Sequence, residues 1–148
     1  MKKITIINGP NLNFLGIREK SVYGNENYND LINMIKEKAK ELDMQVDVFQ
    51  SNSEGGIIDK IQQCYFDNVD GIIINPGAYT HYSYAIRDAI ASVNIKTIEV
   101  HISNIYEREQ FRKISVIEPV CCEQIYGKGL LGYNIAMDHI LNIINNIR

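Results

Sequence analysis

Gly71-Ile72-Ile73-Ile74-Asn75 is a short, almost entirely apolar stretch of the sequence, and Pro76-Gly77 follows it directly. A run without a polar face is typical of a central strand in a parallel sheet, because helices cover both faces of such a sheet. Proline lacks the N–H donor that a strand needs, and glycine favours turns, so the pair ends the strand. The stretch predicts an α/β fold built around one buried parallel strand.

Strand-like and helix-like segments alternate on both sides of this stretch. Strict alternation implies right-handed crossovers and a parallel sheet with helices on both faces. We therefore predict a flavodoxin-like α/β fold with a five-stranded parallel sheet, in a single domain covering residues 1–148. The other expected strands are 3–8, 44–50, 96–101 and 121–126, the helices are about 28–42, 54–65, 83–93 and 130–146, and a helical turn lies near 106–112.

Capping residues locate the start of two of these helices. Asn27 precedes the first apolar period and Asp30 stands three residues later, which is the spacing of a capping box. Ser51-Asn52-Ser53-Glu54 supplies side-chain oxygens before the second helix.

Composition limits the class of protein. Of the 148 residues, 45% are hydrophobic and 22% are charged, as in a soluble globular domain. The net charge is −3 and no long cationic run is present, so we expect neither nucleic acid nor an anionic membrane as a partner. There is no signal-peptide pattern and no apolar run of the roughly 18–20 residues that a membrane span needs. We expect a cytoplasmic protein.

Several familiar sites are not expected. Cys64, Cys121 and Cys122 are odd in number and include no CxxC pair, which indicates reduced thiols rather than a disulfide framework. The three histidines lack metal-ligand spacing, so we predict no metal site. The GxGxxG pattern at 127–132 opens the last helix, and no further strand follows that could complete a dinucleotide fold. A tight turn explains its glycines.

A long loop follows the first strand, from Asn8 to Gly24, and loops of this length are uncommon unless they bind ligands or close over a site. We predict that residues of about 13–24 form a lid. Within it, Arg18 lies five residues before Tyr23, and a nearby guanidinium would favour the phenolate and allow it to act as a general base. The alternative is that Tyr23, one of nine tyrosines, only packs.

Polar residues also follow the later strands, and parallel strands all end at the same edge of a sheet. Asn75 and His81 follow the central strand. Glu99 and His101 end the next, and because they are two residues apart they project to the same side. The carboxylate could keep the imidazole protonated as an acid. The alternative is a structural histidine beside a solvated glutamate.

For the remaining candidate residues, the sequence alone does not decide between a role in a binding site and a place on the protein surface. His81 suits a ligand contact or a helix cap, and His139 has no polar neighbours in sequence and is interpreted as structural. Arg108 and Arg112 lie about one helical turn apart. They and Asp88 fit either a cleft or a solvated helix face.

Taken together, the signatures resemble the type II 3-dehydroquinate dehydratases. The match runs almost from end to end, and four signatures occur in the same order. They are Asn8-Gly9-Pro10-Asn11-Leu12 through Arg18-Glu19 to Tyr23-Gly24, then Gln50-Ser51-Asn52, then Ile74 to His81, and then Glu99 to Asn104 continuing through Glu107-Arg108-Glu109 and Phe111-Arg112.

The resemblance implies a lyase of the shikimate pathway that removes water from 3-dehydroquinate by anti elimination, through an enolate, to give 3-dehydroshikimate. It makes Tyr23 the base, with Arg18 lowering the pKa of its phenol. A water bound near Asn11 would hold the enolate, which is an oxyanion-type stabilisation. No metal or organic cofactor is implied.

The same resemblance assigns the rest of the site. His101 would protonate the departing hydroxyl, and Glu99 and Asn75 would hold the His101 side chain in place. The substrate carboxylate would bind the backbone N–H groups of Ile102 and Ser103 and the Ser103 hydroxyl. Ring hydroxyls would bind to Asn75, His81 and Arg112.

The resemblance further implies a homo-oligomer, a dodecamer built from trimers, in which Asp88 reaches Arg112 in a neighbouring subunit. One departure concerns the predicted lid, where Lys20 stands at a position that the family usually fills with proline. Two other functions remain open on the sequence: a flavodoxin-like binding or regulatory domain, and a lyase or isomerase acting on a related cyclic hydroxy acid.

Overall fold

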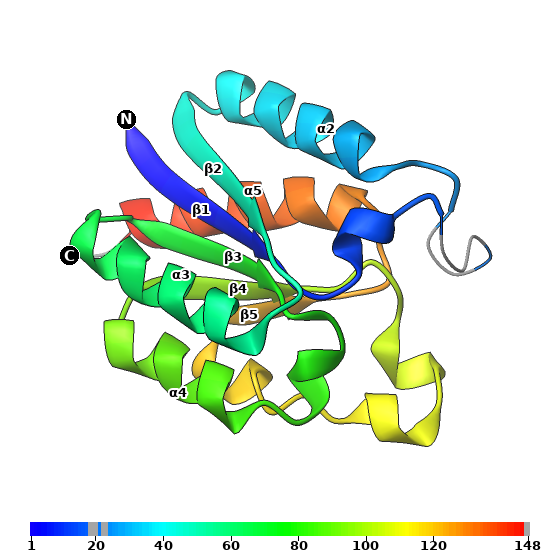
Figure 1. Ribbon diagram of the computed structural model, residues 1–148. Coiled ribbons are helices and arrows are strands. Elements are labelled where there is room, and N and C mark those ends of the chain that lie inside the picture. Colours follow the sequence, from blue (N-terminus) through cyan, green and yellow to red (C-terminus); the bar gives the residue numbers. More distant parts are fainter. Residues whose placement is uncertain (18–20, 22–23, 147–148) are drawn as a thin grey trace.

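The strand β3 (Gly71–Asn75) lies in the middle of a five-stranded parallel sheet whose order is β2-β1-β3-β4-β5 (Figure 1). This is a computed structural model, and it describes residues 1–17, 21 and 24–146. All five residues of β3 are buried, as its apolar sequence predicts. The other strands are β1 (Lys2–Asn8), β2 (Met44–Gln50), β4 (Lys96–Val100) and β5 (Glu123–Ile125).

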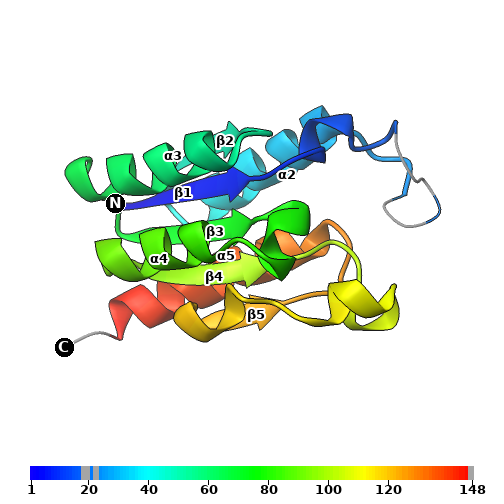
Figure 2. The same cartoon turned by 60° about the horizontal axis from the view of Figure 1, so that its bottom comes forward.

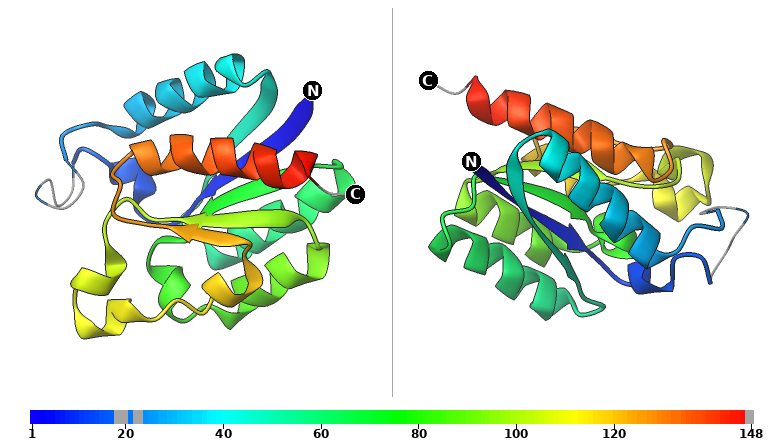
Figure 3. Two further views of the ribbon diagram at one scale, coloured as in Figure 1. Left: turned by 180° about the vertical axis from the view of Figure 1, so that it is seen from behind. Right: turned by 90° about the horizontal axis from the view of Figure 1, so that it is seen from above.

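Four α-helices cover the two faces of the sheet (Figures 1 and 3). α2 (Tyr28–Glu41) and α5 (Leu131–Asn145) pack on one face, and α3 (Glu54–Phe66) and α4 (Tyr84–Val93) pack on the other. The core is accordingly split into two apolar clusters, one on each side of the sheet. The predicted flavodoxin-like α/β architecture is confirmed.

The predicted caps are present. The Asn27 side chain accepts from Asp30 N and the Asp30 carboxylate accepts from Asn27 N, each at 2.9 Å, which completes the capping box. Ser53 caps α3 by accepting from Gly56 N at 3.1 Å. Both helices therefore begin where the local sequence predicts.

The structure differs from the prediction after β4. The expected single turn is two short 3-10 helices, η3 (Ile105–Glu107) and η4 (Gln110–Lys113), because the backbone is extended at Arg108 and Glu109 between them. β5 is also shorter than expected. The 3-10 helix η5 (Glu118–Val120) precedes it, and the backbone turns after it at Gly127, which has a positive φ.

All strands end at one edge of the sheet, and the loops that follow them gather there (Figure 2). The loops after β1 and β3 approach closely. A Cβ on Gly9 would lie 2.6 Å from the carbonyl oxygen of Pro76, and Gly77, which begins the 3-10 helix η2 (Gly77–His81), has φ +60° and packs against Pro10. Glycine at these positions allows the two loops to meet.

The loop after β1 begins with a packed segment. The 3-10 helix η1 (Leu12–Phe14) leads to Leu15, and the side chains of Leu12 and Leu15 are buried in the core. The predicted lid therefore starts next to an anchored turn. Arg18 and Tyr23, the two residues of this lid to which the sequence assigns chemistry, lie outside the described residues. Within the described part of the chain, no helix combines the length and apolarity needed to cross a membrane.

Candidate active site

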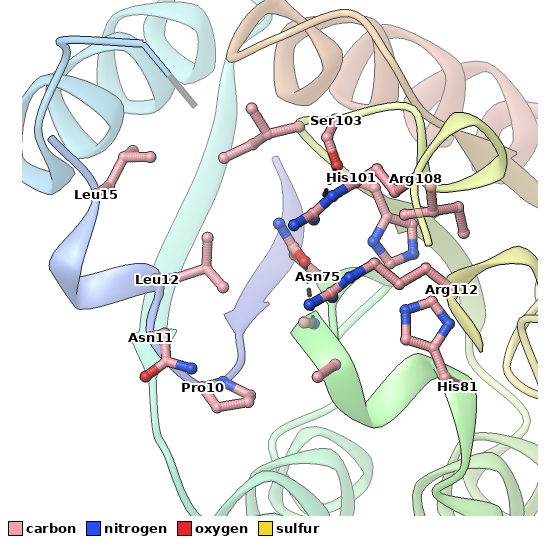
Figure 4. A pocket seen from close by; sticks show the side chains of 14 residues that line it. Pro10, Asn11, Leu12, Leu15, Asn75, His81, His101, Ser103, Arg108 and Arg112 are labelled. Carbon is pink, nitrogen blue, oxygen red and sulfur yellow. Dashed lines mark hydrogen bonds between the residues drawn. The ribbon is translucent and has the colours of Figure 1, made fainter. Parts of the chain in front are cut away.

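A cleft lies at the carboxyl edge of the sheet, between the loop after β1 on one side and the segments after β3 and β4 on the other (Figure 4). Asn75 stands between the two sides. The cleft brings together most of the predicted site residues that the structure describes. Its lining is Pro10, Asn11, Leu12, Leu15, Asn75, Gly77, Ala78, His81, His101, Ile102, Ser103, Ile105, Arg108 and Arg112.

Glu99 and His101 form a buried pair at the end of β4. Glu99 Oε2 lies 2.5 Å from His101 Nε2, and the side chains are 0% and 6% exposed. Burial alone would raise the pKa of Glu99, but the hydrogen bond and charge of His101, with the hydroxyls of Thr80 and Ser115, bring that pKa below its usual value. Glu99 is therefore an acceptor at neutral pH, and His101 Nε2 carries the hydrogen between them.

This pair is suited to proton donation. A buried carboxylate needs a compensating positive charge, and the imidazole in contact with it is able to carry one. Because Glu99 occupies Nε2, the ring nitrogen left for another partner is Nδ1. His101 lines the cleft, so the predicted acid lies where a ligand would meet it.

The Asn75 side chain makes two hydrogen bonds that the sequence did not predict. Its Nδ2 donates to the Tyr133 hydroxyl at 2.9 Å, and its Oδ1 accepts from Gly77 N at 3.1 Å. Within the described residues these bonds, rather than any bond to His101, fix its side chain. Each end of the amide keeps one further hydrogen-bonding position, so the support of His101 by Asn75 stays a prediction.

Ile102 and Ser103 follow β4 and line the cleft, where their backbone amides could meet a ligand. Neither N–H donates to a backbone carbonyl or side chain among the residues the structure describes, whereas their carbonyls accept from Gly129 N and Gly127 N. Consecutive amides of this kind bind anions without a cationic side chain. The Ser103 hydroxyl lies beside them, 3.5 Å from an Arg108 guanidinium nitrogen.

Two arginines and a second histidine form the far wall of the cleft. His81 Nδ1 lies 2.7 Å from the Ile114 carbonyl, which holds that nitrogen as the donor, and burial lowers the pKa of the imidazole despite this bond. Arg112 donates from Nε to Glu109 Oε2 at 2.8 Å, and its guanidinium lies 4.7 Å from the ring centre of Phe111. Both Arg108 and Arg112 line the cleft, so the solvated-face alternative is wrong for them.

The remaining candidates are more scattered. Asn11 lines the cleft in the left-handed conformation, with φ 71°, and its backbone N donates to Asn52 Oδ1 at 2.9 Å. Asp88 lies on α4 with an exposed side chain and is not part of this chain's own cleft.

His139 does have a polar partner, since its Nδ1 lies 2.7 Å from Glu123 Oε2 on β5. Its sequence neighbours could not reveal a partner 16 residues away.

Three residues at the site were not predicted from the sequence. Thr80 and Ser115 contact Glu99, and Tyr133 contacts Asn75. The available signal for Thr80 was its place in the loop after β3, next to His81. Tyr133 occupies an apolar position of α5 and gives no local sign of a polar role.

Among the residues that the structure describes, there is neither a disulfide nor a group of side chains arranged to bind a metal ion. The three cysteines are free thiols, and burial raises the pKa of Cys64 and of Cys121. No group of three or more His, Cys, Asp or Glu residues is arranged to hold a metal ion within residues 1–17, 21 and 24–146.

Comparison with known proteins shows the family to which this chain belongs. Residues 2–141 match the family model described as Dehydroquinase class II. A 3-dehydroquinate dehydratase of Caldicellulosiruptor saccharolyticus is 62% identical over 144 residues, which is 97% of this chain and 99% of that protein. One of Lachnospira eligens is 61% identical over 142 residues, covering 95% and 97% of the two chains.

Solved structures agree. The crystal structure of type II dehydroquinase from Butyrivibrio crossotus has a TM-score of 0.94 and 67% identity, covering 95% of this chain and 97% of that one. The enzyme from Propionibacterium acnes has a TM-score of 0.91 at 39% identity, with 99% and 98% covered. With both sequence and fold matched over nearly its whole length, this chain belongs to the class II dehydroquinase family.

Proposed function

We propose that this cleft is the active site at which the chain removes water from 3-dehydroquinate to give 3-dehydroshikimate, a step of the shikimate pathway. Membership of the family and the name that its relatives of about 60% identity carry support this reaction. The observation in the structure that carries the proposal is the buried Glu99–His101 pair, followed directly by the amides of Ile102 and Ser103, which have no partner among the described residues. It offers an acid next to an anion site, which the elimination needs.

Elimination begins with a base. The proton next to the ketone is acidic enough for a phenolate to remove, and this forms an enolate. We assign the base to Tyr23 and its activation to Arg18, on the family resemblance. A guanidinium suits this role because it stays charged while the phenol loses its proton. Asn11, at the cleft wall, would bind the water that holds the enolate oxygen.

His101 completes the reaction. The enolate re-forms the ketone as the carbon–carbon double bond forms and the C–O bond to the hydroxyl breaks. His101 gives its proton to that hydroxyl, which leaves as water. Tyr23 then releases the proton that it took and His101 regains the one that it gave, both through solvent, so the enzyme ends as it began. Glu99 supports the imidazolium before transfer.

The substrate's polar groups match the lining. Its carboxylate would accept hydrogen bonds from the amides of Ile102 and Ser103 and from the Ser103 hydroxyl. Its ring hydroxyls would contact Asn75, His81 and Arg112, which lie below Ser103 in the view of Figure 4. A neutral His81 whose Nδ1 is occupied by Ile114 offers Nε2 as an acceptor for such a hydroxyl.

Assembly would complete the site. Asp88 is exposed on α4 and does not line its own cleft, and this supports a role in reaching Arg112 of a neighbouring subunit. Among the residues that the structure describes, Arg112 donates a hydrogen bond from Nε alone, to Glu109, which leaves the other guanidinium nitrogens for a second carboxylate. We propose a dodecamer of trimers, acting in the cytoplasm on a small-molecule substrate without a cofactor. Residues 1–148 would form one catalytic domain, with a lid at about 13–24.

The reaction is tested by adding the purified protein to 3-dehydroquinate and following the ultraviolet absorbance of the conjugated enone product. A matched sample is first treated with borohydride, which would trap a Schiff base between a lysine and the ketone. Growth of the absorbance that borohydride leaves unchanged supports the elimination described here. If the folded protein produces no enone, the proposal is wrong, and quinate and shikimate relatives become the substrates to screen.

A further inference from the structure

Glu99 has two neighbours to which the reaction above gives no role. The Thr80 hydroxyl, from η2, donates to Glu99 Oε2 at 2.5 Å. The Ser115 hydroxyl, just after η4, lies 2.9 Å from Oε2 and 3.0 Å from Oε1. Together with His101, these hydroxyls place three donors around one buried carboxylate.

Counting hydrogens fixes the direction of these bonds. Ser115 Oγ accepts from two backbone amides, Ile117 N at 3.2 Å and Glu118 N at 3.1 Å. Its lone pairs are therefore engaged, and its single hydrogen is left for Glu99. Thr80 is fully buried and likewise has one hydrogen to donate. A carboxyl group that accepts from every neighbour is favoured in its ionised form.

The two hydroxyls also join separate parts of the cleft. Ser115 stands three residues after Arg112, and the next residue, Val116, donates its N–H to the Thr80 carbonyl at 2.8 Å. The hydroxyl oxygens of Thr80 and Ser115 are 3.0 Å apart. The segment that carries Arg112 is thus fastened to the segment that carries His81 directly over Glu99.

We propose that Thr80 and Ser115 are positioning residues for the proton donor: their hydroxyls keep Glu99 ionised and hold its Oε2 against His101. This inference rests on the function proposed above. It adds that the acid depends on donors from two loops outside β4. Losing either hydroxyl removes a hydrogen bond to a charged group and raises the pKa of Glu99.

Other titratable groups act on the same carboxylate. His81 from η2, Tyr106 from η3 and Cys121 after η5 interact with it electrostatically, while His101 contacts it directly. Substitution of Ser115 or Thr80 leaves all four in place. A change in the pH dependence can therefore be attributed to the missing hydroxyl.

The test compares Ser115→Ala and Thr80→Val with the unchanged protein in the enone assay, across pH. We expect kcat to fall roughly 10- to 100-fold, the range for losing one hydrogen bond to a charged group. The pH at which Glu99 takes up a proton, followed by the carbon-13 resonance of its carboxyl group, rises by about one unit, since Glu99 is protonated more easily. Ser115→Thr keeps the hydroxyl, so its kcat and its titration of Glu99 should match those of the unchanged protein.

Ser83→Ala is the matched control. Ser83 Oγ also donates to a carboxylate, Glu54 at 2.5 Å, and also accepts from a backbone amide, Ile86 N at 3.1 Å, but it does so at the start of α4. Loss of the Ser83 hydroxyl lowers stability without moving the titration of Glu99. If Ser115→Ala does not fold, Thr80→Val carries the test, because valine has the shape of threonine and lacks only the hydroxyl.

Two results overturn the inference. One is that both kcat and the titration of Glu99 in Ser115→Ala and Thr80→Val match those of the unchanged protein. The other is a lower kcat with an unchanged titration of Glu99, which would mean that these residues act by packing alone. Failure of the proposed function is seen separately, as absence of enone with the unchanged protein.

Discussion

The Tyr133 hydroxyl on α5 donates to Asn8 Oδ1 at the end of β1, 2.6 Å away, although 125 positions separate the two residues. Since a hydroxyl has one hydrogen, Tyr133 must then accept from Asn75 Nδ2, 2.9 Å away. This sets the orientation of the Asn75 amide, whose Oδ1 takes the Gly77 N–H. A fully buried tyrosine below the cleft therefore decides which end of Asn75 a ligand can meet.

Tyr133→Phe removes that hydroxyl and leaves Asn8 Oδ1 and Asn75 Nδ2 without their partner. We expect the free energy of unfolding to fall by about 1–3 kcal/mol, the cost of buried polar groups left unsatisfied, and KM to rise. Urea unfolding and the enone assay measure the two effects. Tyr28→Phe is the control, because its half-exposed hydroxyl only accepts from Asn8 Nδ2, at 3.2 Å. Equal losses in both variants would contradict this interpretation.

Glu99 predicts a specific loss of stability in acid. Its folded pKa lies below its usual value, so its contribution is complete above about pH 4.3, the value for an unfolded glutamate, and disappears as pH falls through the folded pKa. The stability difference between the unchanged protein and Glu99→Gln should therefore shrink below about pH 4. Urea midpoints from pH 6 to pH 2.5 measure it, with Glu37→Gln, an exposed glutamate of α2, as control. A difference that stays constant over this range would refute the assignment.

Local signals in the sequence were enough to predict most of the fold. The apolar run of β3 gave its exact bounds, and Asn27 with Asp30 located the start of α2 because capping involves only neighbouring residues. The segment after β4 was predicted less well. Its backbone extends at Arg108 and Glu109 between η3 and η4, and short 3-10 turns have no strong periodicity.

In the site, too, contacts between residues close in sequence were predicted and contacts between distant residues were not. Glu99 and His101 were paired from the sequence, since alternate residues of a strand share a face. Ser115 and Tyr133 were missed, because their contacts join residues 16 or more positions apart and form only when the sheet brings the loops together.

Tyr23→Phe tests the base. Because only the phenolic hydroxyl is lost, we expect turnover to disappear while the fold and ligand affinity remain close to those of the unchanged protein. Circular dichroism, calorimetric titration with a substrate analogue and the enone assay measure the three properties. A variant that retains near-normal kcat would remove Tyr23 from this role.

Asp88→Ala tests the contribution of a neighbouring subunit. We expect a weaker assembly and a higher KM, since Arg112 would lose a carboxylate partner supplied from outside its own chain. Sedimentation velocity and the dependence of KM on protein concentration measure this. Glu37→Ala, another exposed acid, is the control. An unchanged oligomer with an unchanged KM would show that Asp88 makes no such contact.

The central claim, that His101 donates the proton to the departing hydroxyl, is tested most directly by His101→Asn with 3-dehydroquinate in deuterated water. Removal of the proton next to the ketone does not need His101, whereas loss of the hydroxyl does. We predict that enone formation falls by about 10²–10⁴-fold, the range for a general acid, while nuclear magnetic resonance still shows that proton exchanging for deuterium. Enone formation within a few-fold of the unchanged protein would contradict the account.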